Sequence, residues 1–367
     1  MPAVLLEFVL PLFVFSVFVV MASVNRPARG GTIAEALTAI RLRPRAARAR
    51  VYAAAMDVLA GLLEGPRARG AFMIRALFDP PWSVRIADEA PLSVMVMVRG
   101  TAWVVPEDGT PPQRIRPGDL AIARGPDHYT CAGDPATKAL AEIQPGERCV
   151  PLGDAPPGKY GSLGLRAWGE SHDSSVEMLI GTYQMRGEIT GRLLDALPPL
   201  LVLPTEVWDC PLTPLLADEI SKDEPGQDVV LDRLLDLLLI AALRAWFSRP
   251  EAAAPAWYRA MGDSVVGRAL RLLQDDPAHP WTIADLAAKA GVSRAALARR
   301  FTELVGEPPM TYLTNWRLAL AADLLRDSEL TIASIARKVG YGSAFALSGA
   351  FKRVYGISPQ EHRTRAA

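Results

Sequence analysis

The sequence predicts an α+β protein of several domains, with a β-rich N-terminal domain, a helical connecting segment and an all-α C-terminal domain. Its 367 residues exceed what one hydrophobic core usually supports. Short apolar runs separated by turns fill residues 70–185, an apolar pattern of helical period follows, and the C-terminal part is helical between Gly and Pro breaks. We place the domains at residues 1–55, 56–186, 187–256 and 257–367.

Residues 1–55 form an extension whose two halves differ in composition. Residues 4–20 are almost wholly apolar, and seven arginines lie between positions 26 and 50. The apolar run has marginal length for a membrane span, and no basic segment precedes it as in a secretory signal. Three interpretations stay open: translation begins at Met56 and the extension is not made, the extension is a membrane anchor, or it has a folded role. We favour the first and expect a cytoplasmic protein without a membrane partner.

Residues 56–186 are predicted to form a small antiparallel β-barrel or sandwich. Turn sequences rich in Gly, Pro and Asp separate short apolar runs, and this is the pattern of strands connected by tight turns. The runs lie at residues 71–77, 82–86, 92–98, 102–105, 120–123 and 178–183.

Residues 187–256 are predicted to be a helical dimerisation or linker segment. Residues 227–247 should form one long amphipathic helix, because a single stripe of helical period contains Leu231, Leu234, Leu235, Leu238, Ala241, Ala242 and Ala245. The stripe can pack on its own domain, or it can pack against the same helix of a second subunit and so form a homodimer. Residues 249–256, with two prolines and an alanine run, predict a hinge.

An internal repeat is the most informative feature of the C-terminal domain. Residues 282–291 recur in similar form as residues 331–340, at a shift of 49 positions. One extra residue enters in the turn, and at a shift of 50 positions Ser293, Leu297 and Phe301 then match Ser343, Leu347 and Phe351. Two copies in phase indicate a duplicated structural unit.

Each copy has the features of a helix-turn-helix unit, over residues 282–303 and 331–353. A Thr caps the first helix, a small Ala lets the second helix cross closely, and a Gly takes the turn conformation that a Cβ disfavours. A Ser caps the second helix, whose Leu and Phe point inward and leave the opposite face for DNA. Residues 310–326 are predicted to be a helical spacer that lets both units enter successive major grooves, about 34 Å apart.

The charge distribution agrees with a nucleic-acid partner. The whole chain has zero net charge, but residues 257–367 hold 15 Lys and Arg against 10 Asp and Glu. A protein that binds phosphates needs a basic balance of this kind. We therefore expect double-stranded DNA as the partner.

The C-terminal domain resembles the DNA-binding domain of the AraC/XylS family of transcription regulators. The stretch from Gly340 to Ser343 and the stretch from Ala350 to Pro359 are similar to that family's signature. The resemblance implies that DNA contacts come from the free faces of the two second helices. In the first unit these residues are Arg294, Ala295, Ala298, Arg299 and Arg300, and in the second unit they are Phe345, Ser348, Gly349, Lys352 and Arg353.

These residues are expected to have different tasks. Arg299 should read a base, because an Arg can donate two hydrogen bonds to guanine O6 and N7. Arg294 and Arg300 should hold phosphate, although Arg300 can equally be a solvated surface charge. In the second unit Gly349 and Ala344 stand where the family often has an Arg and a polar residue. We therefore expect the second helix to anchor the DNA backbone more than it reads bases.

Residues 57–245 resemble the cupin-like sensor domain of one branch of the same family, through stretches at residues 79–82, 103–106, 116–119 and 145–149. The resemblance implies a β-barrel that senses an effector, either a small molecule or an oxidant. The side chains that could line a ligand site are Trp82, Arg85, Trp103 and His128. Core packing is the favoured alternative for the two tryptophans, and simple solvation is the alternative for the histidine.

No metal or other cofactor is expected. Metal-dependent cupin enzymes need two or three His and a carboxylate inside the barrel, and here the barrel segment offers only His128.

Two cysteines are candidates for a redox role. Cys131 and Cys149 lie on neighbouring predicted elements and could approach within disulfide range, and Arg148 could lower the pKa of the Cys149 thiol beside it. Inert buried cysteines are the interpretation we favour.

The sequence therefore predicts a dimeric, DNA-binding regulator that is not an enzyme. Two alternatives stay open. A cupin-type enzyme with an appended helical domain is disfavoured by the scarcity of His. A membrane-tethered regulator depends on residues 1–24.

Overall fold

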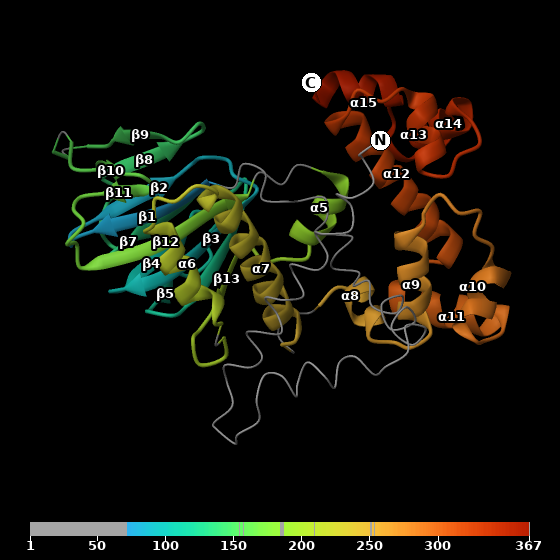
Figure 1. Ribbon diagram of the computed structural model, residues 1–367, viewed down its shortest axis with the longest axis horizontal. Coiled ribbons are helices and arrows are strands. Elements are labelled where there is room, and N and C mark those ends of the chain that lie inside the picture. Colours follow the sequence, from blue (N-terminus) through green and yellow to red (C-terminus); the bar gives the residue numbers. More distant parts are fainter. Residues whose placement is uncertain are drawn as a thin grey trace, which may run out of the picture. The chain divides into compact units, whose positions relative to one another are not determined.

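The computed structural model describes residues 72–153, 155–156, 158–183, 187–208, 210–249, 252 and 254–366 (Figure 1). The expectations for residues 1–55 therefore lie outside the part of the chain that the structure describes. A β-rich domain comes first in the described chain and a wholly helical domain follows it. No helix among the described residues combines the length and the hydropathy that a membrane span needs.

Seven strands form the larger sheet of the β-rich domain. They are β1 (Phe72–Phe78), β3 (Leu92–Arg99), β6 (Leu120–Arg124), β10 (Gly161–Gly164), β11 (Ala167–Gly169), β12 (Val176–Tyr183) and β13 (Leu200–Leu203). Their order is β10-β11-β1-β12-β3-β6-β13. Neighbouring strands are antiparallel, except that β1 and β11 are parallel.

Six strands form the smaller sheet. They are β2 (Ser83–Ile86), β4 (Ala102–Pro106), β5 (Gln113–Ile115), β7 (Tyr129–Ala132), β8 (Ala141–Gln144) and β9 (Arg148–Pro151). Their order is β5-β4-β7-β2-β8-β9, and only β2 and β8 are parallel.

The two sheets enclose an apolar core, so the domain has the sandwich-like form of the predicted fold and not a single closed barrel. Side chains of both sheets meet in this core, among them Phe78 and Met95 of the larger sheet and Val104 and Cys131 of the smaller one. The six predicted strand positions are confirmed. The expected sheet was antiparallel throughout, whereas the structure has two parallel pairs, β1 with β11 and β2 with β8. Parallel neighbours need a long connection, and a long stretch of chain does separate the strands of each pair.

The strand β3 shows why both faces of the larger sheet are apolar. Successive side chains of a strand point to opposite faces. Leu92, Val94 and Val96 pack toward helices, whereas Met95 and Met97 pack toward the smaller sheet. A strand that is buried on both faces has a continuous apolar sequence, as β3 does.

Helices α5 (Glu188–Leu194), α6 (Leu212–Ile220) and α7 (Gln227–Phe247) follow the sandwich in the chain. The helix α7 has the predicted bounds, and its apolar stripe packs on its own domain. The Tyr183 hydroxyl donates a hydrogen bond to the Leu235 carbonyl at 2.7 Å. Gly181 permits this close approach, because a Cβ at that position would lie 2.8 Å from Leu235 Cδ2. Of the two alternatives that the sequence left open for the apolar stripe of α7, the structure therefore shows packing on its own domain.

The segment 187–256 is not purely helical, which differs from the prediction. The strand β13 lies within it and pairs with β6 at the edge of the larger sheet. Leu201 and Leu203 of β13 are buried, and the residues next to them are half-buried. This segment thus completes the sheet that α6 and α7 cover.

Eight helices form the C-terminal domain of the described chain. They are α8 (Ala256–Met261), α9 (Val266–Asp275), α10 (Ile283–Ala290), α11 (Arg294–Val305), α12 (Pro309–Asp327), α13 (Ile332–Lys338), α14 (Ala344–Tyr355) and α15 (Pro359–Ala366). The pairs α10/α11 and α13/α14 are the two predicted helix-turn-helix units, and α12 is the predicted spacer. Figure 1 shows α12 running between the two pairs.

The helix ends have the local chemistry that the repeat predicts. The Thr282 hydroxyl accepts from the Asp285 N–H, and the Asp285 carboxylate accepts from the Thr282 N–H, which completes a capping box. Ser293 and Ser343 cap α11 and α14 through the backbone N–H groups of Ala296 and Ala346. Each cap satisfies a backbone donor that the helix itself leaves free.

Two turn glycines offer a matched test of the hairpins. Gly291 and Gly340 both have positive φ, 73° and 83°. A Cβ on Gly291 meets nothing within 4 Å, whereas a Cβ on Gly340 would lie 2.9 Å from the Ala278 backbone. We expect Gly291→Ala to lower the free energy of unfolding by about 1 kcal/mol, and Gly340→Ala to lower it by more. Differential scanning calorimetry of both variants measures this order, and equal losses would contradict it.

Candidate nucleic-acid interface

The helix α11 presents a basic face opposite its apolar face. Leu297 and Phe301 are fully buried in the core of the first helix-turn-helix unit. The predicted contact residues lie on the other side of the helix, where Arg294, Ala295, Arg299 and Arg300 are exposed and Ala298 is half-buried. The face that the sequence assigns to DNA is therefore accessible.

Arg299 is free to leave its partner within the protein. Its side chain is 74% exposed, and its Nη1 lies 3.5 Å from Glu303 Oε1 one turn along the helix. An exposed ion pair of this kind contributes little free energy. A guanine edge can therefore replace Glu303 as the partner of the guanidinium at small cost.

Arg300 has a partner that the sequence analysis did not predict. Its Nε donates to Asp263 Oδ2 at 2.9 Å, and Asp263 Oδ1 accepts from the N–H groups of Val265 and Val266 at the start of α9. Burial raises the pKa of Asp263, but these backbone donors and Arg300 outweigh it, so that the pKa is lowered overall. Arg300 thus links α11 to the start of α9 through this ion pair, while its side chain stays 48% exposed.

The helix α14 presents a face of a different character. Leu347 and Phe351 are fully buried, as their counterparts are in the first unit. On the opposite side Gly349, Lys352 and Arg353 are exposed and Ser348 is half-buried. The two basic residues form no ion pair with any described residue.

Phe345 is the most exposed large apolar side chain of the described residues, at 89%. Its neighbours on the helix, Ala344 and Ala346, are small, and a Cβ on Gly349 would meet nothing within 4 Å. The ring therefore projects from α14 with open space around it. An apolar side chain on a recognition helix can contact the methyl group of thymine.

Two arginines that the sequence did not single out connect α12 to its surroundings. Arg317 of α12 donates to the backbone carbonyls of Pro277 and His279 at 2.7 and 2.8 Å. Arg363 of α15 donates to the carbonyls of Leu325 and Leu330 at either side of the turn after α12. Neither residue belongs to the repeat, and carbonyl partners have no sequence signature, so the pattern could not reveal them.

Four predicted ligand residues of the β-rich domain do not line its main cavity. Trp82 is fully buried and stacks on Phe78, with the ring centroids 4.4 Å apart, so core packing describes it. Trp103 of β4 is half-buried.

Arg85 is held by two carboxylates. It donates at 2.6 Å to both Glu107 and Glu142, and its Nη2 lies 2.8 Å from His128 Nδ1. These ion pairs raise the pKa of Arg85 and fix its side chain within the smaller sheet.

The expected approach of Cys131 to Cys149 is wrong. The strands that hold them, β7 and β9, have β2 and β8 between them. Three strand spacings amount to about 14 Å, whereas a disulfide needs Cα atoms within about 7 Å. Burial raises the pKa of Cys131 to about 12 and raises that of Cys149, so both thiols are less reactive than an exposed one.

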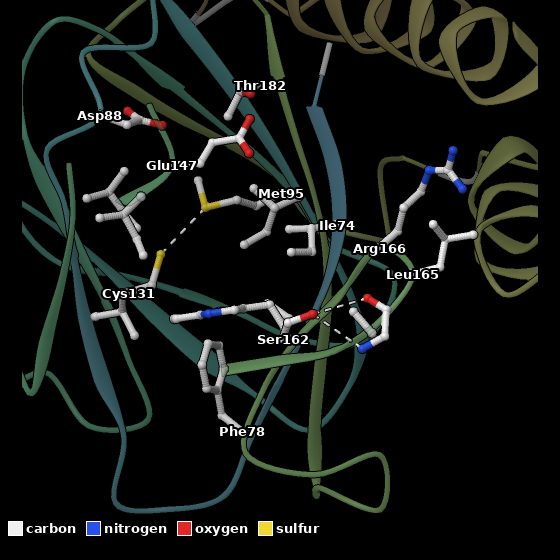
Figure 2. A pocket seen from close by; sticks show the side chains of 18 of the residues that line it. Ile74, Phe78, Asp88, Met95, Cys131, Glu147, Ser162, Leu165, Arg166 and Thr182 are labelled. Atoms are coloured by element: carbon white, nitrogen blue, oxygen red, sulfur yellow. Dashed lines mark hydrogen bonds between the residues drawn. The ribbon is translucent and has the colours of Figure 1, made fainter. Parts of the chain in front are cut away.

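A cavity of about 550 Å³ opens among side chains of both sheets (Figure 2). Apolar side chains dominate its lining, for example Ile74, Phe78 and Met95. The thiol of Cys131 faces it and donates to Met95 Sδ at 3.6 Å. Cys131 is thus the one predicted ligand or redox residue that lines this cavity. No group of three or more His, Cys, Asp or Glu that could bind a metal occurs among the described residues.

Comparisons with known proteins agree with both parts of this fold. Residues 57–248 match the family model described as Cupin, and residues 286–365 match the one described as Helix-turn-helix domain. A putative AraC-like transcription regulator of Streptomyces lividans is 33% identical over 313 residues, which cover 84% of this chain and 98% of that protein. The HTH-type transcriptional regulator AlkR of Acinetobacter baylyi is 28% identical, over 78% of this chain and 92% of its own.

A solved structure of the DNA-binding domain of AdpA in complex with a target DNA is similar to part of the chain. The sequence identity is 31%, the TM-score is 0.27, and the match covers 28% of this chain and 93% of that one. The family models and the relatives together give the assignment: the chain belongs to the AraC-type DNA-binding transcription regulators, with an N-terminal cupin domain and a C-terminal helix-turn-helix domain.

Proposed function

We propose that α11 and α14 bind successive major grooves of one DNA site, and that a small molecule in the cupin cavity controls this binding. The observation that carries the proposal is the pair of accessible recognition faces, each opposite a fully buried Leu and Phe. The names of the relatives support a regulator and not an enzyme. Because such a protein acts on DNA, we propose that it works in the cytoplasm.

The two units divide the work of recognition. Arg299 reads a base, since it is exposed and weakly paired. Arg294, Lys352 and Arg353 hold phosphates, which supplies affinity without sequence preference. Phe345 contacts a thymine methyl group, and this gives the second helix a reading task that the sequence analysis did not assign to it.

A selection of bound duplexes from a random pool, made with the full chain, tests the two-unit reader. We expect a bipartite motif whose blocks are about one helical turn apart, and an affinity that falls steeply with salt.

Arg299→Ala should relax the base preference at one position of the motif, at a cost of about 1 to 3 kcal/mol in binding free energy. Lys352→Ala should weaken specific and random DNA alike and reduce the salt slope by about one.

The contrast between these two variants is the control. If Arg299→Ala loses the same affinity on the selected and on random duplexes, its assignment as a base reader is wrong. A selection that enriches a single block would show that only one of the two units reads bases.

Replacing each thymine of the selected site by uracil, one at a time, tests Phe345. Uracil lacks only the methyl group, so one position should lose about 0.8 kcal/mol, or about fourfold in affinity. Phe345→Ala should abolish the difference between thymine and uracil at that position, and Lys352→Ala should preserve it. A thymine preference that survives in Phe345→Ala would show that another group reads the methyl.

We also propose that the outer face of α7 joins two copies of the chain. Val230 and Leu237 lie seven residues apart on this helix and are 43% and 50% exposed, on the side away from the buried stripe. Apolar residues at this spacing form the seam of paired helices. A second copy of α7 would cover both of them.

Leu237→Glu should therefore weaken the dimer at least about tenfold, which is about 1.4 kcal/mol, because a carboxylate would be buried in an apolar seam. Sedimentation velocity over a range of protein concentrations measures this. Val207→Glu, at an exposed valine outside α7, is the matched control and should leave the dimer unchanged. A monomeric native chain, or an unaltered dimer in Leu237→Glu, would exclude this interface.

A further inference from the structure

We propose that the cavity of the cupin domain binds a lipophilic organic cation, that is, an apolar molecule that carries an ammonium group. This inference rests on the proposed function, because it names the chemical class of the effector. Three features of the cavity lead to it: the apolar lining, the charge of the groups that face it, and an aromatic ring in its wall.

The side chains that line the cavity determine how polar the main part of the ligand can be. Most side chains around the cavity are aliphatic or aromatic and come from both sheets, including Ile74, Val84, Ile86, Ile143 and Ile180. The volume of about 550 Å³ suits a small organic molecule. A sugar or another polyol would regain only a few of its hydrogen bonds to water against a lining that is mostly apolar, and this costs free energy. The ligand therefore has an apolar body.

The charged groups at the cavity determine which charge the polar end of the ligand should carry. Figure 2 shows the carboxylates of Asp88 and Glu147 at one end of the cavity, together with the hydroxyl of Thr182. Asp88 accepts one hydrogen bond, from the Ala90 N–H at 3.1 Å, and Glu147 has no side-chain partner among the described residues. Both carboxylates thus have acceptor capacity left for a ligand.

Arg166 does not neutralise these carboxylates. It is the one basic residue in the lining given by the described chain, and its guanidinium donates to Gln227 and Asp228 at the start of α7. Figure 2 shows its side chain pointing away from Asp88 and Glu147. The cavity is therefore negative at one end, and it favours a cation over a neutral molecule and a neutral molecule over an anion.

One aromatic ring adds a second attraction for a cation. Tyr129 lines the cavity and pairs with Ile86, two residues before Asp88, whereas Figure 2 shows Phe78 at the other end of the cavity, where it can contact only the apolar body of the ligand. The face of an aromatic ring attracts an organic ammonium group, most strongly where water is excluded. The carboxylates and the ring of Tyr129 at one end of an apolar cavity together select a lipophilic cation.

Three probes with one decyl chain and different heads test the inference: decyltrimethylammonium, 1-decanol and decanoate, each below its micelle concentration. Calorimetric titration of the full-length chain should give an affinity for the cation at least about tenfold above that for the alcohol, and the weakest binding for decanoate. Equal affinities, or tightest binding of decanoate, would overturn the proposal.

Variants then locate the preference. The double variant Asp88→Asn, Glu147→Gln should lose the preference for the cation while it keeps its affinity for 1-decanol. Glu206→Gln, at an exposed carboxylate outside the cavity, is the matched control and should bind as the native chain does. Ile74→Trp, which fills the cavity, should abolish binding of both probes. Binding that survives in a folded Ile74→Trp variant would place the probe elsewhere and overturn the proposal.

Affinity for the selected DNA, measured with and without the cation, separates this inference from the proposed function. A bipartite DNA motif without a preference for the cation would reject the ligand class and leave the reader intact. A cation preference that depends on Asp88 and Glu147, in a chain that selects no DNA motif, would support the site and reject the reader.

Discussion

The helix α12 is the constraint on which DNA recognition depends, because one rigid element belongs to both hydrophobic cores of the C-terminal domain. Tyr312 and Trp316 are buried in the core of the first unit, and Leu318 and Leu325 are buried in the core of the second. Residues on opposite sides of one helix keep a fixed separation and rotation. The helices α11 and α14, which we propose as the recognition helices, are consequently attached to one common element.

This rigidity makes the spacing of the DNA site a property of the protein. With a flexible linker, each unit could bind its own groove independently. Each unit would then lose its own conformational and orientational freedom on binding. Here Arg317 adds hydrogen bonds from α12 to the turn between α9 and α10, and Arg363 adds hydrogen bonds from α15 to the end of α12 and the turn after it. Because these hydrogen bonds already order the two units in the folded chain, we expect less conformational entropy to be lost when DNA binds.

The sequence predicted the parts of the fold that have a period. The helix α7 and the two helix-turn-helix units were placed correctly, because caps, turn glycines and apolar spacing are local features. The short strand β5 has a single buried residue, and β13 lies among helices, so neither had a periodic signal. The repeat also assigned the outward faces of α11 and α14 correctly.

Non-local pairings could not be predicted in this way. Cys131 and Cys149 lie close in the chain, yet the order of strands in the sheet separates them, and that order depends on the packing of the whole domain. Arg300 and Asp263 pair across 37 positions with no motif to link them. The cavity collects single residues from strands of both sheets, so its charge and apolar lining become visible only in the folded chain.

Arg166 connects the cavity to the helix that covers the sandwich. Its carbonyl accepts from the Arg75 N–H at 2.8 Å, which ties its backbone to β1, while its guanidinium holds Gln227 and Asp228 in the first turn of α7. The Gln227 amide in turn donates to the carbonyls of Glu219 and Lys222, at the end of α6. Since Arg166 is part of the cavity wall, a ligand that displaces it must also break contacts at the junction of α6 and α7. One side chain thus links the wall of the cavity to the junction of α6 and α7.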